Sequence, residues 1–366
     1  GTSTYTHACF DIKQNKFVDY TGIGDTERPY RKIKHYGSDT WMFSNTSGIR
    51  HIAFHSGEFS VTDYTADNHE LNSNDIRELC EDNNHAVWAA STKGMIKISS
   101  KGKACTFESN IEFLGCISYK DKILAFSKKN QTAYIFSSNG KLINKCVLAS
   151  VMGRIGAIKG SIVWRGKWII FTNNDTFLLD INAGMFEKDS KLQVPAGAQQ
   201  GYLDGYQFVG NKSGNLWVFP PTGDFRMLKM IPNLQTTNEK NGIFKIVRAK
   251  SGLFYIATYG GGLFTYNYAT GEMQRFTAED KNPIIHSNFL LEIITDNTGC
   301  IWVSAENAGL SRITPADNNA AYYMIDYKQK GDWTNYMKNI FMGKDGNVIV
   351  STMCNNLYNF NQKTKT

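Results

Sequence analysis

The chain repeats itself with a period of 47 residues near its C-terminus. The stretch ITDNTGCIWVSAENAGL, residues 294–310, is matched by VRAKSGLFYIATYGGGL 47 residues earlier and by FMGKDGNVIVSTMCNNL 47 residues later. Glycines align at positions 252, 299 and 346, and leucines align at positions 263, 310 and 357. A fixed period of 40 to 50 residues indicates one supersecondary unit repeated along the chain, and it decides the fold.

Each repeat has the pattern of short antiparallel strands. An apolar run is followed by an Asp/Asn-Gly turn, a strand around a large apolar residue, a second glycine turn, a strand that begins Gly-Leu, and an outer strand. The Asp can hydrogen-bond its own backbone, and glycine adopts the positive φ that the reversals need. No segment keeps a 3.6-residue period over a dozen residues, whereas alternation recurs throughout. We therefore predict an all-β fold, a β-propeller of four-stranded antiparallel blades.

Eight such units can be counted, about 44 residues apart on average. The large residues of their second strands are Trp41, Trp88, Leu124, Ile169, Gln207, Tyr255, Trp302 and Ile349. Between residues 105 and 235 the Asp-Gly turn and the Trp are lost, so the boundaries there stay open and we expect seven or eight blades.

We expect one propeller domain over residues 1–366. The last unit, residues 336–360, lacks an outer strand, and residues 16–20 have the pattern of one. The N-terminal strand is therefore predicted to complete the last blade and to close the ring, which would protect the sheet edges. Because the chain begins without Met, we also expect it to be a piece of a longer receptor.

Composition and charge exclude several classes of function. The net charge of +7 comes from 40 basic and 33 acidic residues that are scattered, without the basic stripe of a nucleic-acid-binding surface. No apolar run approaches the roughly 18 residues that span a bilayer, so we expect no membrane contact by this part of the chain. The seven cysteines lack metal-ligand spacing, and we expect buried free thiols, with one or two disulfide bonds left open. No cofactor and no metal site are predicted.

No catalytic constellation emerges from the sequence. His51 and His55 share a strand face, but no acidic third ligand accompanies them, so a packing or solvent role is expected. The YGGGL stretch, residues 259–263, lacks the Lys-Ser/Thr and the helix of a phosphate loop and falls at a turn of the repeat. The chain is predicted not to be an enzyme.

Propellers bind ligands mainly at the face where loops between second and third strands meet loops between consecutive blades. Amides and charges on such loops can pair with sugar hydroxyls, and aromatic rings can stack on sugar C–H surfaces. The candidate ligand-binding residues are Asn45, Arg154, Gln199, Gln200, Asn238, Asn241, Tyr259, His286, Glu306, Asn307, Trp333 and Asn335.

The repeat resembles that of the two-component regulator propeller family. The segments DNTGCIWVSAENAGL, KSGLFYIATYGGGLFTYN and DGNVIVSTMCNNLYNF carry the family's D-x-x-G-x-[IL]-W and Gly-Leu pattern. LNSNDI and IIHSNFL are similar to its lead-in to the first strand. The likeness covers residues 30–98 and 240–360 strongly and 105–235 weakly, and family members commonly have seven blades where eight units are counted here.

The resemblance implies a function as an expectation. Such propellers are periplasmic sensor parts of hybrid two-component systems, so we expect a sensor that recognises a glycan-derived oligosaccharide and transmits a signal. The resemblance also implies a homodimeric receptor. A histidine kinase would lie in a cytoplasmic part. Two alternatives stay open: a protein-interaction scaffold and, less favoured, a carbohydrate-active enzyme.

Overall fold

The computed structural model describes residues 9–11, 16–18, 30–55, 58–127, 129, 131–148, 158–172, 175–187, 192, 199–210, 214–230, 242–326, 328, 333–343, 345–354 and 356–362. They belong to two compact units, Gly1–Gln193 and Val194–Thr366. Almost all regular structure in these ranges is β-strand. No helix among them is long and apolar enough to cross a membrane.

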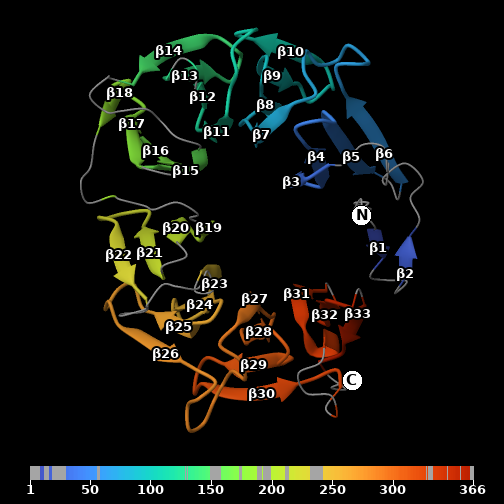
Figure 1. Cartoon of the computed structure of the whole chain (residues 1–366), viewed down its shortest axis with the longest axis vertical. Helices are drawn as coiled ribbons and strands as arrows, with labels where there is room; N and C mark the ends of the chain where they lie inside the picture. Colours follow the sequence, from blue (N-terminus) through green and yellow to red (C-terminus); the bar gives the residue numbers. More distant parts are fainter. Residues whose placement is uncertain are drawn as a thin grey trace. The chain divides into compact units, whose positions relative to one another are not determined.

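The first unit contains four consecutive four-stranded antiparallel sheets, coloured blue to green in Figure 1. Their strands pair in the orders β3-β4-β5-β6, β10-β9-β8-β7, β11-β12-β13-β14 and β15-β16-β17-β18. Their bounds are β3 (Lys32–Tyr36), β4 (Asp39–Phe43), β5 (Ile49–His55), β6 (Glu58–Tyr64), β7 (Ile76–Glu81), β8 (Val87–Ser91), β9 (Gly94–Ile98), β10 (Ala104–Phe107), β11 (Gly115–Tyr119), β12 (Lys122–Ser127), β13 (Thr132–Ser137), β14 (Leu142–Val147), β15 (Ile158–Trp164), β16 (Lys167–Thr172), β17 (Thr176–Asp180) and β18 (Met185–Glu187).

In the second unit the same plan is repeated three times with four strands and once with three. The sheets are β19-β20-β21-β22, β23-β24-β25-β26, β27-β28-β29-β30 and β31-β32-β33. Their bounds are β19 (Gln199–Leu203), β20 (Tyr206–Gly210), β21 (Asn215–Phe219), β22 (Arg226–Lys229), β23 (Ile243–Arg248), β24 (Phe254–Thr258), β25 (Gly262–Tyr266), β26 (Met273–Phe276), β27 (Leu290–Thr295), β28 (Ile301–Ala305), β29 (Leu310–Thr314), β30 (Asn319–Tyr323), β31 (Met337–Met342), β32 (Val348–Thr352) and β33 (Leu357–Phe360). A short 3₁₀ helix, η2 (Trp333–Asn335), precedes the last sheet.

The strand order confirms the predicted β-propeller fold. Within each unit the first strand of a sheet lies beside the first strand of the next, as with β7, β11 and β15 in the first unit and β23, β27 and β31 in the second (Figure 1). All eight predicted second-strand residues lie on second strands: β4, β8, β12, β16, β20, β24, β28 and β32. The described residues therefore contain eight blade-like sheets, seven of four strands and one of three.

The predicted ring closure is not among the described strand pairings. Residues 16–18 form β2 (Lys16–Val18), which pairs with β1 (Cys9–Asp11) in a two-stranded sheet. Residues 19 and 20 lie outside the described residues. The expected completion of the β31-β32-β33 sheet by the N-terminal strand would involve both units, and it stays a prediction. The organisation as a single domain also stays a prediction.

The Asp-Gly-Trp pattern of the repeat is a hydrogen-bonded corner. One carboxylate oxygen of Asp296 accepts the backbone N–H groups of Thr298 and Cys300 at 2.9 and 3.0 Å. The other accepts the indole N–H of Trp302 at 2.9 Å, and the Arg312 guanidinium lies 3.4 Å from it. A buried donor and a buried acceptor satisfy each other in this way, which avoids the cost of leaving either unpaired.

An equivalent corner lies in the first unit. Asp82 accepts the backbone N–H groups of Asn84 and Ala86 and the indole N–H of Trp88, and Lys97 takes the place of the arginine. Trp88 is fully buried, and so is its counterpart in the second unit. The corner therefore fixes the turn and also anchors the largest side chain between neighbouring sheets.

The second glycine of the repeat is required by a close backbone approach. Gly309 has a φ of +66°, and a Cβ there would lie 2.2 Å from the carbonyl oxygen of Tyr323 on β30. Its own N–H donates to the carbonyl of Asn335 at 3.2 Å. This glycine thus joins the turn after β28 to the loop that precedes β31.

Candidate functional site

Three consecutive sheets of the second unit end their second strands in the same way. The first residue after the strand donates its backbone N–H to the carbonyl of the residue 17 positions earlier, just before or near the start of the first strand. The 47-residue period is preserved in these pairs, which are Tyr259–Gly242, Glu306–Phe289 and Met353–Tyr336. The repeat therefore brings the side chains at these positions to one end of the sheets.

At this end, Tyr259 and Glu306 contact each other across two neighbouring sheets. The Tyr259 hydroxyl donates a hydrogen bond to Oε2 of Glu306. This hydrogen bond, followed by burial and by the Glu306 charge, raises the pKa of Tyr259 above its ordinary range. The phenol therefore stays protonated and remains a donor to the carboxylate at neutral pH.

Tyr336 completes the polar part of the site from the third sheet. A side-chain hydrogen bond links its hydroxyl to that of Tyr259. Burial and the nearby Glu306 charge raise the pKa of Tyr336, although the hydrogen bond with Tyr259 acts in the opposite direction. One carboxylate is thus flanked by two neutral phenols.

Aromatic rings form the apolar part of the site. The ring of Tyr259 lies 5.8 Å from that of Phe244 and 5.1 Å, edge to face, from that of Phe289. Trp333 stacks on Tyr336 with ring centres 6.0 Å apart and planes 15° apart. The Trp333 side chain is 59% exposed, so it is available to an incoming ligand. We call these six residues the aromatic–carboxylate cluster: Phe244, Tyr259, Phe289, Glu306, Trp333 and Tyr336.

The loop that carries Trp333 is tied by the side chain of the buried Asn335 to the backbone after β30. The Asn335 side-chain oxygen accepts the backbone N–H groups of Ile325 and Asp326 at 3.0 and 3.2 Å, and its amide N–H donates to the Asp326 carbonyl at 2.8 Å. Asn335, predicted as a ligand contact, therefore uses its amide within the loop.

Asn307 lies next to Glu306 in the same turn, with a φ of +55°. Its side-chain oxygen is buried and has no hydrogen-bond partner among the described residues. Buried amide oxygens are nearly always paired, so this unpaired oxygen is an acceptor that a water molecule or a ligand donor could satisfy.

The remaining predicted ligand contacts are not part of the cluster. His286 is exposed and stacks on Tyr322 with ring centres 3.8 Å apart. Asn45 is exposed in the first unit, and Gln199 and Gln200 lie on β19. Arg154, Asn238 and Asn241 lie outside the described residues.

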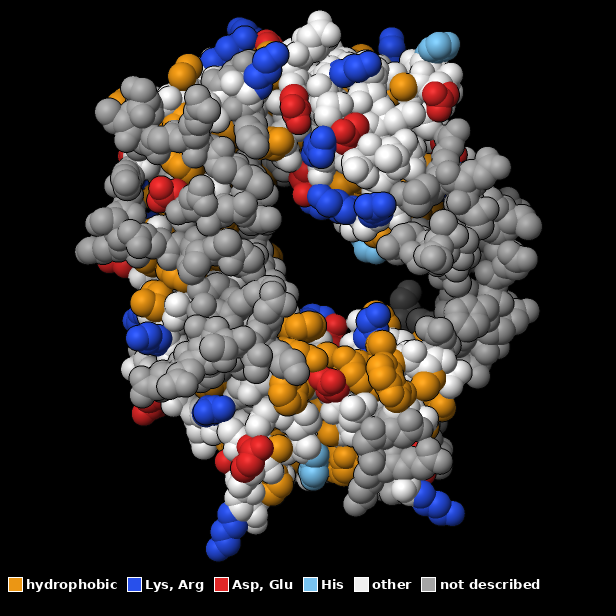
Figure 2. All heavy atoms as spheres, in the orientation of Figure 1, with side chains coloured by type: hydrophobic (Ala, Val, Ile, Leu, Met, Phe, Trp, Pro, Cys, Tyr) orange, Lys and Arg blue, Asp and Glu red, His pale blue; other side chains and the backbone are white. Residues whose placement is uncertain are grey.

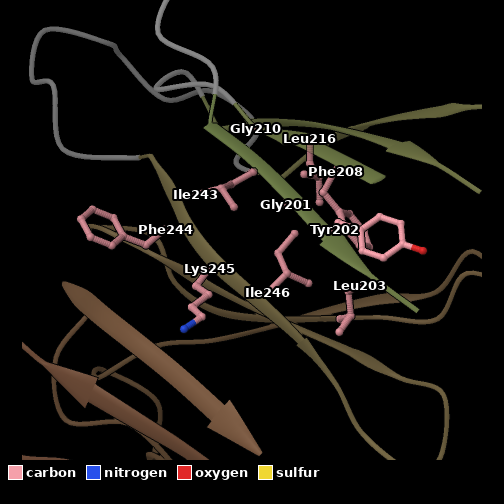
Figure 3. A pocket seen from close by; sticks show the side chains of 10 residues that line it. All are labelled: Gly201, Tyr202, Leu203, Phe208, Gly210, Leu216, Ile243, Phe244, Lys245 and Ile246. Atoms are coloured by element: carbon pink, nitrogen blue, oxygen red, sulfur yellow. The ribbon is translucent and has the colours of Figure 1, made fainter. Parts of the chain in front are cut away.

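A cavity of about 310 Å³ opens between β19 and β23, also in the second unit. Figure 3 shows Ile243 and Ile246 directed toward the β19 side, whereas Phe244 points away from them. The lining is mostly apolar, and its one charged residue, Lys245, pairs with Glu292. Phe244 therefore belongs both to the rim of this cavity and to the aromatic–carboxylate cluster.

Exposed apolar side chains accompany the cluster on this unit. Phe244, Trp333, Phe341 and Met353 all expose more than a third of their surface. Figure 2 shows hydrophobic side chains gathered in its lower half, over the region of β27 and β31. Exposed apolar surface of this kind marks binding sites more often than ordinary surface.

The described residues contain no group of three or more His, Cys, Asp and Glu side chains able to hold a metal ion. His51 packs as expected: its ring stacks on Trp41 at 4.1 Å, and its Nε2 lies 2.8 Å from Asp39. The side chain of His55 is outside the described part.

Comparisons with known proteins support the fold. No protein-family model matches the chain, and no curated protein matches it. The structure is similar to that of BamB from Moraxella catarrhalis, with 14% identity, a TM-score of 0.50 and coverage of 90% of this chain and 92% of that one. It is similar to the computationally designed Ika8 protein, with 9% identity, a TM-score of 0.52 and coverage of 89% and 93%.

A further similarity is to the extracellular domain assigned to a hybrid two-component system of B. thetaiotaomicron. The identity is 13%, the TM-score is 0.38, and the match covers 95% of this chain. The chain spans 53% of the length of that domain. At identities of 14% and 9%, the similarities to BamB and Ika8 bear on the fold alone, and they agree with the β-propeller.

Proposed function

We propose that this chain is the ligand-sensing, extracytoplasmic propeller of a hybrid two-component system, and that its ligand is an oligosaccharide bound at the aromatic–carboxylate cluster. The assignment to a hybrid two-component system is supported by the repeat motifs, which resemble those of the two-component regulator propeller family. The cluster, in which an exposed Trp lies beside a carboxylate flanked by phenols, supports the ligand class. In this proposal the parent receptor is a homodimer anchored in the inner membrane, and its histidine kinase lies in a cytoplasmic part outside this chain.

The chemistry of the cluster suits a sugar. Trp333 offers a flat face to C–H groups, and stacking on an aromatic ring contributes about 1 kcal/mol beyond burial. Glu306 and Asn307 offer acceptors to hydroxyl donors, and charged acceptors form the stronger hydrogen bonds. Glu306 is the one carboxylate in the cluster, whereas glycoside hydrolysis commonly uses a pair, so the arrangement favours binding over hydrolysis.

The test is a thermal-shift screen of the chain against host and plant oligosaccharides, followed by calorimetry of each hit. A ligand that binds only the folded state raises the melting temperature. For a ligand bound at the cluster, Trp333→Ala and Glu306→Gln each weaken binding about tenfold. Glu272→Gln, on an exposed turn of the same unit, is the matched control and leaves affinity unchanged.

The outcomes separate the site from the ligand class. If an oligosaccharide binds both cluster variants as tightly as it binds the parent chain, its site lies elsewhere on the propeller. A failure of every oligosaccharide would reject the ligand class. The exposed apolar side chains of the second unit support a second candidate function, a protein-interaction scaffold. A scaffold predicts a protein partner whose binding is lost in Trp333→Ala.

A further inference from the structure

Two buried cysteines face each other between neighbouring sheets of the first unit. Cys80 lies on β7 and Cys116 on β11, the first strands of consecutive sheets, which lie side by side in Figure 1. Their side chains are 6% and 7% exposed. Both belong to one apolar cluster, in which β8 contributes Trp88 and Ala90, β9 contributes Met95, and the next sheet contributes Ile123, Ala125 and Phe136.

The contacts of Cys116 show that its sulfur reaches across to the neighbouring sheet. Its Sγ lies 3.6 Å from the carbonyl oxygen of Glu78 and 3.7 Å from that of Trp88. Cys80 is the residue paired with Trp88 in the β7–β8 ladder. A side-chain hydrogen bond joins the two thiols. The two thiols thus face each other within one apolar cluster between the sheets.

Among the cysteines whose side chains the structure describes, no other has this arrangement. Cys146 is buried in a different cluster that contains no second cysteine, and Cys300 lies 4.0 Å from the hydroxyl of Thr314. Cys105 and Cys354 are exposed and belong to different units. The pairing of Cys80 with Cys116 is therefore specific to one interface between sheets.

We propose that Cys80 and Cys116 form an intrachain disulfide bond that links the β7–β10 sheet to the β11–β14 sheet in the mature protein. The bond crosses between two sheets that pack against each other through this apolar cluster. It closes a loop of about 35 residues, and cross-links of this span stabilise a fold chiefly by restricting the unfolded chain.

The oxidant is a molecule that contains a disulfide bond, either another protein or oxidised glutathione. One thiolate attacks a sulfur of the oxidant and displaces one thiol, and the second cysteine then attacks the mixed disulfide and displaces the other. Two cysteine thiols and one oxidant disulfide are thereby converted to one cystine and two oxidant thiols, so electrons and protons balance.

The environment predicts when the bond forms. The hydrogen bond with Cys116, followed by burial, holds the pKa of the Cys80 thiol well above its ordinary range. Because the thiolate is the attacking species, the folded, reduced protein reacts slowly. Bond formation therefore takes place during folding or during local opening of this interface, and the finished bond is protected from exchange.

The inference goes beyond sensing and does not depend on the ligand. The extracytoplasmic location proposed above would supply the oxidant in the cell, but the chemistry is tested in vitro. The purified chain is unfolded, reduced, and refolded in a glutathione redox buffer. Free thiols are then trapped and counted under denaturing conditions, and peptides are mapped by mass spectrometry without reduction.

The expected result is five reactive thiols, because two of the seven cysteines are consumed, together with a linked peptide pair that contains Cys80 and Cys116. Seven reactive thiols would overturn the proposal. A linked pair that joins any other cysteines would overturn it as well. Both outcomes are read on the unmodified sequence, so they do not require that a variant folds.

A second measurement separates the cross-link from packing. Reduction of the oxidised protein by a phosphine under denaturing conditions, followed by refolding with the reductant present, lowers its melting temperature by about 5 °C. The same reductant leaves Cys80→Ser and Cys116→Ser unchanged, while the exposed-site control Cys105→Ser responds like the parent chain. Equal responses of the parent chain and Cys116→Ser would contradict the proposed bond.

Discussion

Gly309 offers a test of how tightly the repeat constrains its backbone. In Gly309→Ala the new Cβ meets two costs: a φ of +66°, and a carbonyl oxygen of Tyr323 only 2.2 Å away. The left-handed backbone costs an alanine about 1 kcal/mol. Relief of the overlap requires β29 and β30 to separate near Leu310, which pairs with Tyr323, and weakens ladder hydrogen bonds by about 2 kcal/mol. We therefore expect a loss of about 3 kcal/mol in the free energy of unfolding.

Gly346 supplies the matched control. Its φ is +82°, but a Cβ there would have no atom within 4 Å. Gly346→Ala should therefore cost only the backbone term, about 1 kcal/mol. The assay is urea unfolding followed by Trp fluorescence, with equal m-values as the condition for comparison. Equal losses for the two variants would refute the close-approach argument.

Three further predictions concern pH, the cavity and the cluster. Burial alone would raise the pKa of Asp296, but hydrogen bonds from Thr298, Trp302 and Cys300 and the charge of Arg312 lower it below its ordinary 3.8. This carboxylate therefore contributes stability that is present above pH 3.8 and is lost as the pH falls below that value. The difference in the free energy of unfolding between the parent chain and Asp296→Asn should therefore decrease below pH 3.8, as measured by acid unfolding curves. Gly201→Ala places a methyl in open space on a strand that lines the cavity, so urea unfolding should show a gain of about 0.5 kcal/mol, and a loss would mean the space is already filled. Tyr259→Phe leaves Glu306 without its donor and should cost about 1 kcal/mol by the same assay, whereas no change would mean that water replaces the hydroxyl.

Alternation of apolar residues is enough to predict the blades that lack the Asp-Gly turn and the Trp of the repeat. Leu124 and Ile169 are predicted as second-strand residues although their units lack the Asp-Gly turn and have no Trp at the repeat position, and both lie on buried second strands. A sheet packed on both faces needs apolar residues at these positions whatever the turn sequence is. The turn motif is therefore sufficient for a blade of this fold but not necessary.

The sequence predicted part of the candidate site. Tyr259, Glu306 and Trp333 were found because loops between strands carry polar and aromatic groups to one end of the sheets. Phe289 and Tyr336 were missed, because an aromatic residue at the start of a strand has the same pattern as a core residue. A signal was present in the repeat: both lie 17 residues before the first residue after a second strand.

The corner formed by Asp296 and Trp302 shows why some changes between repeats are coupled. The repeat 47 residues earlier has Ala249 and Tyr255 at these positions, and the repeat 47 residues later has Gly343 and Ile349. In both cases the carboxylate and the indole are absent together. A buried carboxylate without the indole N–H, or an indole without an acceptor, would leave a buried polar group unpaired.

A double-mutant cycle measures this coupling. Asp296→Asn and Trp302→Phe each break a hydrogen bond whose carboxylate acceptor is charged, and each leaves the partner buried without its counterpart. The double variant removes both groups, so it should be more stable than the sum of the two losses predicts by about 2 kcal/mol. The cycle is measured by urea unfolding, with Asp345→Asn replacing Asp296→Asn as the control, because Asp345 is an exposed turn residue that contacts Asn347 and no Trp. Additive losses in the main cycle would mean that each group acts alone, and the joint loss of both in neighbouring repeats would then need another explanation.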